Sequence, residues 1–456
     1  MGVRSLGWVG ILLVALAAAV APAAPPNVLF IAIDDLNDVP GFMGRYPDAI
    51  TPNLDRIAER GVVFTDAHCQ FPVCAPSRAS LMSGFYPYNL GFQTQAKDSV
   101  ALKCTRERGG RLLPEHFRDH GYYTMAVGKL LHRHVPDEIV DESGGRGDWN
   151  KLPSGKRLKW DPTNGGTMTD WGPYPGEDSD MTDHQAADWA IKRLGESYDK
   201  PFMLMVGFLR PHVPWHVPQQ WFDLYPDPAK LTKPAYLASD LEDVPKFARE
   251  MNIYPWMPRT SWAIETGQWQ DILQAYLACT SFVDHQVGRV LEALEQSPHA
   301  KNTVIVLWSD HGYHLGEKNT FQKQTTWERA SHVPMVFSGP GIVPGGRCDR
   351  PVGLIDIYPT LVELAGLPAN KLNEGRSLVP LLEDPGREWD HPVLVSWKKD
   401  SHALQTDRYR YIRYGDGSEE LYDHASDPNE WTNVVDNPDY EAVKRQLAAQ
   451  LAERVD

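Results

Sequence analysis

The sequence is short of positive charge. Its 45 lysine and arginine residues face 60 aspartate and glutamate residues, giving a formal net charge of −15 over 456 residues. Proteins that wrap nucleic acid need a basic surface, because phosphate contacts dominate such binding, so this composition argues against a nucleic-acid partner. It does not exclude a small anionic substrate, since a local cationic pocket can lie inside an acidic protein.

Long hydrophobic runs are absent beyond the N-terminus. The apolar run 7–20 follows Arg4 and precedes the small residues Ala21-Pro22-Ala23, which is the pattern of a cleaved export signal. The run is shorter than the roughly 20 residues that a membrane span needs. We therefore expect residues 1–23 to be a signal peptide. The mature chain is expected to be exported, either periplasmic or secreted, without stable membrane insertion.

Cysteine is also scarce. An exported protein usually pairs its cysteines, so an odd number leaves at least one thiol unpaired or used for another purpose. The spacing leaves open whether the remaining four form disulfides. The five cysteines are Cys69, Cys74, Cys104, Cys279 and Cys348.

Four apolar runs end in polar or charged side chains, and helical patterns separate them. Alternating strands and helices predict an α/β fold with a large, mostly parallel sheet sandwiched by helices. Polar residues just beyond the strand ends, Asp34, Lys129, His212 and Asp310, should then converge at one edge of the sheet. The runs are residues 27–34, 122–129, 202–210 and 303–310, and the helical patterns are residues 54–60, 112–120 and 271–296.

The pattern changes after about residue 385. Short strand-like segments at residues 392–397, 408–414 and 420–422, with turns between them, are followed by a helical segment that starts near Tyr440. This predicts a catalytic domain at residues 24–385 and a small C-terminal α+β subdomain at residues 386–456, with a short antiparallel sheet. Residues 141–180 and 211–262, rich in Pro, Gly and aromatic side chains, are predicted to be long loops over the crevice.

Asp34-Asp35 and Asp310-His311-Gly312 each follow a predicted strand. Adjacent buried carboxylates repel each other, so both stay ionised only beside strong positive charge, and a divalent cation supplies it. Oxygen ligands suit calcium or magnesium. An isolated Asp-Asp pair more often caps a helix or lies in a solvated turn. Two such clusters at one sheet edge favour a metal site.

Cys74 lies shortly before a predicted helix at residues 79–82, and Arg78 follows it closely. A helix N-terminus offers free N–H groups and a positive dipole, which together with Arg78 favour an anion at this position. Composition alone favours a structural or disulfide-bonded cysteine.

The segment around Cys74 also resembles a known signature. Cys-x-Pro-x-Arg followed by Ala-Ser-Leu-Met-Ser-Gly is similar to the maturation signature of the type I sulfatase family, in which the cysteine is oxidised to formylglycine. The resemblance extends from about residue 27 into the C-terminal subdomain, in family order. Other matching segments are residues 27–30, 34–35, 51–55, 128–129, 211–212 and 309–312.

Within this family the chain most resembles the iduronate-2-sulfatases. His311 occupies a position where many sulfatases have Asn, and the spacing Gly-Lys-x-x-His includes Lys129 and His132. The run 309–323, continued at residues 332–334, is also similar to that branch.

The resemblance implies a ligand set and a cofactor. Asp34, Asp35, Asp310 and His311 would bind one calcium ion per chain, together with the formylglycine made from Cys74. A formylglycine-generating or other sulfatase-maturing enzyme would be needed as a partner.

The resemblance also implies catalytic roles. Arg78 would hold the oxygens of the modified residue, and Lys129, His212 and Lys323 would contact the substrate. Lys318 is an alternative to Lys323. One hydroxyl of the hydrated formylglycine would attack sulfur, and His212 would protonate the leaving alcohol. His132 would take the proton of the second hydroxyl as the aldehyde re-forms and sulfate leaves. Three further histidines lie near the motifs as possible substrate contacts: His134, His216 and His314.

Three classes of function are compared. The first is a sulfuric ester hydrolase for a sulfated carbohydrate, such as a 2-O-sulfated uronic acid in a glycosaminoglycan-like polymer. The second is an aryl- or choline-sulfatase, or a phosphonate or phosphodiester hydrolase, on the same scaffold. The third is a binding protein without turnover, which the complete set of catalytic residue types disfavours.

Overall fold

The computed structural model describes residues 2, 24–150, 152, 154–160, 167–398 and 400–455. The expected signal peptide, apart from Gly2, lies outside these residues. Within them, a nine-stranded sheet has the order β4-β3-β5-β1-β6-β7-β2-β8, with β9 paired to β2. Its strands are β1 (Asn27–Ile33), β2 (Gly61–His68), β3 (Tyr123–Gly128), β4 (Glu142–Ser143), β5 (Phe202–Phe208), β6 (Thr303–Ser309), β7 (His332–Ser338), β8 (Gly346–Cys348) and β9 (Val352–Gly353).

Most strand pairs of this sheet are parallel, as predicted; β7 is antiparallel to both β6 and β2. The four predicted strands correspond to β1, β3, β5 and β6, which are neighbours in the sheet. Their C-terminal ends therefore lie at one edge. The central strand β1 is buried on both faces along its whole length, which explains why its sequence is a continuous apolar run.

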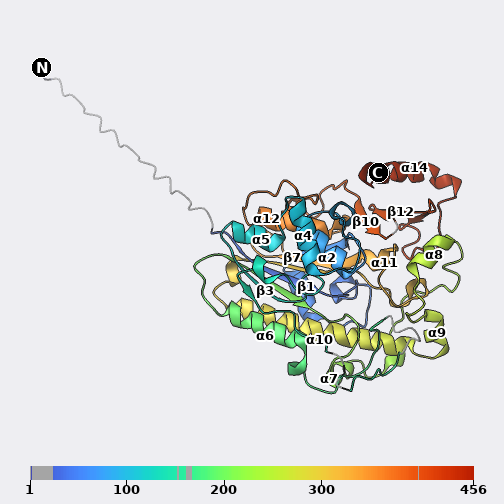
Figure 1. Ribbon diagram of the computed structural model, residues 1–456, viewed down its shortest axis with the longest axis horizontal. Coiled ribbons are helices and arrows are strands. Elements are labelled where there is room, and N and C mark those ends of the chain that lie inside the picture. The colour runs from blue at the N-terminus through green and yellow to red at the C-terminus, as the bar shows by residue number, and fades with distance from the viewer. Residues whose placement is uncertain are drawn as a thin grey trace.

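Helices cover both faces of the large sheet (Figure 1). Alternate residues of β1 belong to different cores: Leu29 and Ile31 pack with α1, α6 and α10, whereas Val28 and Phe30 pack with α2, α5 and α12. The α-helices are α1 (Pro52–Glu59), α2 (Cys74–Ser83), α3 (Pro87–Leu90), α4 (Asp98–Glu107), α5 (Leu113–Asp119), α6 (Thr182–Leu194), α7 (Gln219–Phe222), α8 (Lys246–Asn252), α9 (Thr260–Glu265), α10 (Trp269–Gln296), α11 (Glu328–Ser331), α12 (Ile357–Leu364), α13 (Val379–Glu383) and α14 (Glu441–Val455). Short 3-10 helices span Gly41–Met43, Asp137–Ile139, Asp178–Asp180, Pro228–Lys230, Ala300–Asn302, Glu317–Asn319, Leu354–Asp356 and Pro438–Tyr440.

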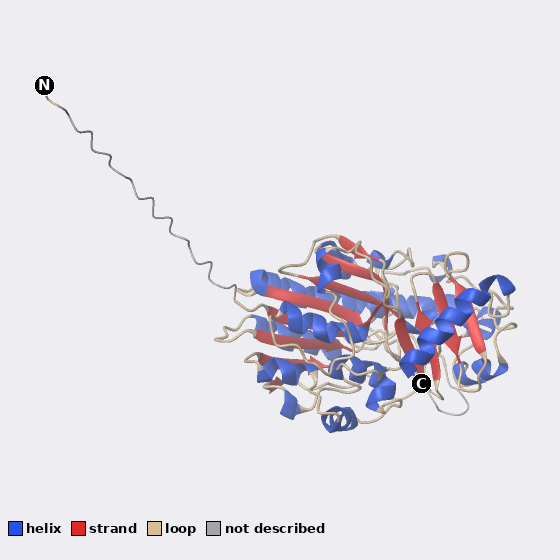
Figure 2. Cartoon of the chain, turned by 90° about the horizontal axis from the view of Figure 1, so that it is seen from above, coloured by secondary structure: helices blue, strands red, loops and turns tan. Residues whose placement is uncertain are grey.

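A separate antiparallel sheet of four strands forms near the C-terminus, as predicted, and lies beside the large sheet (Figure 2). α14 covers one face through Leu447 and Leu451, which pack on Leu404 and Leu421. The boundary expected at residue 385 stays a prediction. The strands are β10 (Val393–Trp397), β11 (Ser401–Gln405), β12 (Tyr409–Arg413) and β13 (Glu419–Asp423).

Two glycines bring the ends of β3 and β5 together. Gly128 pairs with Gly207 across these strands. A Cβ on Gly128 would lie 1.8 Å from the carbonyl oxygen of Gly207, and Gly128 has φ +81°, a conformation that side chains other than glycine rarely adopt. The close approach places Lys129, the next residue, directly beyond the sheet edge.

The described residues contain no helix with the length and apolar character needed to cross a membrane. All five cysteines lie in the described part of the chain, and none is in a disulfide. Four of them are buried and Cys104 is half-buried.

Candidate active site

The four strand ends converge as the sequence predicted. Asp34 and Asp35 follow β1, Lys129 follows β3, His212 lies four residues beyond β5, and Asp310 follows β6. The backbone N–H of Asp35 donates to Asp310 Oδ1 at 3.1 Å, and Lys129 Nζ forms an ion pair with Asp34 Oδ2. The large sheet therefore builds this site from distant segments, since Asp35 and Asp310 are 275 residues apart in the chain.

Donor atoms at this edge are close enough to share one metal ion. One set consists of Asp34, Cys74, Asp310 and His311, and a second set consists of Asp34, Asp35, Cys74 and His212. Within each set the donor atoms lie within 4.8 Å of one another. Asp35 has φ 61°, an uncommon conformation for a non-glycine residue. Its Oδ2 is buried and has no hydrogen-bond partner among the described residues. An orphaned buried carboxylate oxygen fits a divalent cation with oxygen ligands.

The pKa values of Asp310 and His311 also indicate that the site needs additional positive charge. Burial alone would lower the pKa of His311, but the negative charge of Asp310 beside it raises that pKa to about 9. Burial raises the pKa of Asp310 to about 7 despite the opposing charge of Arg78. A bound divalent cation would lower both pKa values, because metal ligands are an ionised carboxylate and a neutral imidazole.

Cys74 is the first residue of α2, so this helix begins five residues earlier than predicted. The side chain is completely buried. Its Sγ lies 3.1 Å from Lys323 Nζ and 3.3 Å from His311 Nε2. Burial alone would raise the pKa of the thiol, but the positive charges of Lys129 and Lys323 hold it well below its usual value. The surroundings of Cys74 therefore favour a negative charge.

Arg78 links the two acidic strand ends from below Cys74. Its Nε donates to Asp310 Oδ2 at 2.8 Å, and its Nη2 lies 3.2 Å from Asp34 Oδ1. Nη1 donates to the carbonyl oxygen of Lys129 at 2.7 Å. The buried guanidinium also donates to the Leu130 carbonyl oxygen and lies over the Trp308 ring. Arg78 therefore fixes the relative positions of Asp34, Asp310 and Lys129.

The two predicted proton-transfer histidines both reach the site. His132 lies close enough to Cys74 to help lower the pKa of its thiol, and its Nδ1 has no partner among the described residues. His212 Nδ1 lies 2.6 Å from the carbonyl oxygen of Val213. This contact marks Nδ1 as the nitrogen that carries the proton in neutral His212, which leaves Nε2 for the site.

Lys323, not its alternative Lys318, lies in the cluster. Lys323 Nζ is 2.6 Å from Asp35 Oδ1 as well as close to Cys74. Lys318 is buried elsewhere, where its Nζ pairs with Asp240 Oδ1 at 2.6 Å and donates to the carbonyl oxygen of Glu430. The two lysines therefore have different tasks although they are only five residues apart.

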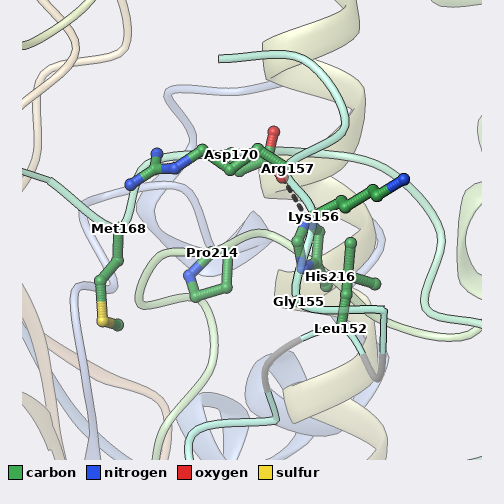
Figure 3. A pocket seen from close by; sticks show the side chains of 8 residues that line it. All are labelled: Leu152, Gly155, Lys156, Arg157, Met168, Asp170, Pro214 and His216. Atoms are coloured by element: carbon green, nitrogen blue, oxygen red, sulfur yellow. Dashed lines mark ion pairs between the residues drawn. The ribbon is translucent and has the colours of Figure 1, made fainter. Parts of the chain in front are cut away.

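The three further histidines lie outside the cluster. The ring nitrogens of His134 contact Gly128 O and Ser143 Oγ, and His314 Nε2 contacts Thr325 Oγ1 at 2.8 Å. His216 lines a separate cavity of about 220 Å³ (Figure 3). The cavity is lined by Leu152, Gly155, Lys156, Arg157, Met168, Asp170, Pro214 and His216, none of them a predicted catalytic or metal-binding residue.

In this cavity His216 Nε2 lies 3.2 Å from Asp170 Oδ2 (Figure 3). Burial would raise the pKa of Asp170, but the His216 contact and the N–H groups of three successive residues, starting at Leu158, lower it to about 2. The pair thus fixes the loop that follows β5, and we assign it a structural role.

Two residues beside the site were not singled out from the sequence. The indole ring of Trp149 lies 5.2 Å from Lys129 Nζ and 5.2 Å from the His212 ring. The guanidinium of Arg146 lies 4.2 Å from the same ring. Both belong to the aperiodic stretch 141–180, which was expected to cover the crevice but offered no pattern for choosing individual residues.

Comparison with known proteins agrees with this geometry. Residues 26–367 match the family model described as Sulfatase, and residues 316–456 match the model described as N-sulphoglucosamine sulphohydrolase, C-terminal. A sulfatase of Formosa agariphila is 47% identical over 438 residues, covering 93% of this chain and 86% of the relative.

More distant relatives point to different substrates. A choline-sulfatase of Rhizobium meliloti is 29% identical, covering 91% of this chain and 83% of the relative. The human iduronate 2-sulfatase is also 29% identical, covering 80% and 74%. Equal identity to both does not distinguish the branches.

The solved structure of a phosphonate monoester hydrolase from Silicibacter pomeroyi superposes with a TM-score of 0.76 at 21% identity, covering 94% of each chain. At this identity the likeness shows the fold alone. The family model spans most of the chain, and the 47% identical relative covers nearly all of it. The chain therefore belongs to the sulfatase family and is a sulfuric ester hydrolase.

Proposed function

We propose that this sulfatase removes sulfate from a sugar, specifically from a 2-O-sulfated uronic acid, with a formylglycine made from Cys74 as its nucleophile. The observation that carries the proposal is the buried position of Cys74 between Lys323 and His311, in a protein whose net charge is −15. Such a local cationic site suits an anionic ester, whose charge must be offset while the S–O bond breaks.

Asp34, Asp35, Asp310 and His311, with the residue made from Cys74, would hold a calcium ion. Bound there, calcium would offset the charge of the sulfate and favour ionisation of the attacking hydroxyl. The orphaned Oδ2 of Asp35 supports this assignment.

Side chains of the protein would bind the sulfate and carry out the two proton transfers. Lys129 and Lys323 bind the sulfate oxygens, because their ammonium groups flank Cys74 in the closed site. His212 acts in its doubly protonated form: Nδ1–H stays bonded to the Val213 carbonyl oxygen, and Nε2–H faces the leaving alcohol and gives it that proton. His132, which lies beside the Cys74 side chain, accepts the proton that is released when the nucleophile is regenerated.

The choice of a uronic acid is supported by residues shared with the iduronate-2-sulfatase branch, His311 and the spacing of Lys129 and His132, and by the relative of that name. An aryl- or choline-sulfatase, or a phosphonate or phosphodiester hydrolase, is the competing proposal. The choline-sulfatase relative at the same identity supports that alternative. We also propose that residues 1–23 direct export and that a sulfatase-maturing enzyme acts on the chain.

Sulfate release should be measured on matched substrates: 2-O-sulfated uronic acid disaccharides, a neutral hexose sulfate, an aryl sulfate, choline sulfate and a phosphonate monoester. The uronic acid should give the highest kcat/KM; a preference for any other substrate would refute this specificity. Mass spectrometry of the Cys74 peptide should show formylglycine, and Cys74→Ala should abolish turnover. Chelation should remove activity and calcium should restore it.

A further inference from the structure

Trp149 connects the catalytic cluster with a second cationic group. Its ring contacts Lys129 and His212, and Arg146 stacks on the same ring. One indole thus contacts both cations, and Asp34, the ion-pair partner of Lys129, also acts on Arg146 through its charge. A sugar whose sulfate is held at Lys129 would therefore bring its neighbouring substituents close to Arg146.

Arg146 has no hydrogen-bond or ion-pair partner among the described residues, and its Nη1 is buried. A guanidinium has five N–H donors, and leaving one buried and unpaired is costly. Arg193 provides an internal comparison, because it stacks on Trp189 at 3.8 Å but also forms an ion pair with Glu142. Arg146 has the same stacking contact but forms no ion pair with a described residue; Asp148 and Asp34 act on it only through their charge.

The loop holds Arg146 in place without using its charge. The N–H of Gly128, next to Lys129, donates to the carbonyl oxygen of Gly145 at 2.8 Å. Three residues beyond Arg146, the carbonyl oxygen of Trp149 accepts from Arg210 Nη2 at 3.4 Å. The backbone is thus held on both sides of Arg146, and the contact with the Trp149 ring orients the guanidinium, which together preorganise it for a ligand.

We propose that Arg146 binds a second anionic group of the substrate, carried by the sugar whose sulfate ester is cleaved. This inference rests on the proposed function and narrows it to sugars with two negative groups. The planar fork of arginine matches a carboxylate or a second sulfate through two parallel N–H···O bonds. Arg146 then determines specificity, while Lys129 and Lys323 hold the ester that reacts.

Binding can be measured without turnover in chains that carry Cys74→Ala. Calorimetry at constant salt would compare a uronic acid 2-sulfate, a hexose disulfate and a neutral hexose 2-sulfate. With Arg146 present, the doubly anionic sugars bind more tightly than the neutral one. Arg146→Gln reduces this preference roughly 10–100-fold, as expected for losing hydrogen bonds between charged groups. A larger effect on one sugar identifies carboxylate or sulfate as the group bound.

Two further variants test whether the effect is specific. Arg193→Gln removes an arginine stacked on tryptophan whose charge is already paired, so the preference should persist. Arg146→Lys keeps the charge but loses the fork, so it should retain only part of the preference. In the matured enzyme, Arg146→Gln should raise KM for doubly anionic sugars more than it lowers kcat.

An unchanged preference in Arg146→Gln, or no measurable binding of any of the three sugars, would overturn the inference. Failure of the proposed function looks different, because the matured enzyme would then release no sulfate from any sugar although Arg146-dependent binding persisted.

Discussion

Single residues of the catalytic cluster were predictable where a motif fixed their neighbours. Cys74, Asp34 and Asp310 were identified from short patterns next to strands or a helix, and the structure brings them together. Arg146 was not identified from the sequence. It stands out because it stacks on the Trp149 ring and forms no ion pair with a described residue, and neither feature leaves a sequence pattern. Physical reasoning from the sequence could not decide whether Lys318 or Lys323 lies in the site, since both follow the same strand in an irregular segment.

Replacing Lys323 should mainly lower activity, whereas replacing Lys318 should mainly lower stability. Lys323→Ala removes a cation beside Cys74, the source of the proposed nucleophile, and should lower kcat/KM by ~100–1,000-fold. Lys318→Ala leaves Asp240 buried without its partner and should cost ~3–5 kcal/mol of unfolding free energy. Sulfate-release kinetics and urea denaturation of both variants test this. Equal kinetic and stability effects in the two variants would contradict the division.

At the scale of elements, long apolar runs were the strongest signals. β1, β3, β5 and β6 were predicted within one or two residues because strands buried on both faces are apolar throughout. β2 and β7 were not predicted: β2 contains Thr65 and Asp66 in its second half, and β7 contains a proline. β11 was missed as well, since Ser401, His402 and Gln405 weaken its apolar pattern.

The junction of β3 and β5 gives a prediction at this scale. In Gly128→Ala the new methyl group meets the Gly207 carbonyl, so the strands must separate and Lys129 must move. We expect a loss of at least ~1–3 kcal/mol in stability together with a fall in activity. Gly44→Ala is the matched control, because Gly44 has φ +75° and open space around its would-be Cβ.

The control should cost ~1–2 kcal/mol from backbone strain alone and leave kcat unchanged. Thermal denaturation and kinetics measured on the same preparations distinguish the two outcomes. If both alanine variants retained wild-type kcat, the close approach would not position Lys129.

On the scale of the whole molecule, the small C-terminal sheet is bound to the segment that carries Lys323. Trp327 Nε1 donates to Glu420 Oε2 at 2.9 Å, and the N–H of Glu328 donates to Glu430 Oε2 at 3.0 Å. Lys318, on the other side of Lys323, is bound to the Glu430 carbonyl. Sequence patterns predicted the second sheet but not this attachment, because it depends on buried polar pairs between distant segments.

The attachment should depend on pH through His424. Its Nε2 lies 3.2 Å from Glu430 Oε1. Burial alone would lower the pKa of His424, but Glu328 and Glu430 raise it above 6.5 despite Arg410. This contribution to stability is complete below pH 6.5 and is lost as the pH rises through the raised value. Burial would raise the pKa of Glu328, but Arg329 and His424 hold it below 4.5, so its contribution is lost on acidification.

The free energy of unfolding should therefore receive its largest contribution from these groups between pH 4.5 and pH 6.5. His424→Gln should cost on the order of 1 kcal/mol at about pH 5.5 and less at about pH 8.5. Denaturation curves at both pH values check this. His391→Gln is the control, since the pKa of His391 is lowered; a cost for His424→Gln that did not change with pH would refute the prediction.

Because Cys74 is completely buried in the folded chain, its proposed modification depends on whether it occurs before or after folding. Lys323, which closes over the sulfur, comes 249 residues later in the chain, so the pocket cannot exist until most of the polypeptide has been made. Under the proposed function, a maturing enzyme must reach this thiol before the pocket closes around it. Folding and modification would then compete, and a chain that folded first would keep an unmodified cysteine and stay inactive although its fold is native. The active fraction of a preparation would then report the relative rates of two processes rather than the stability of the fold.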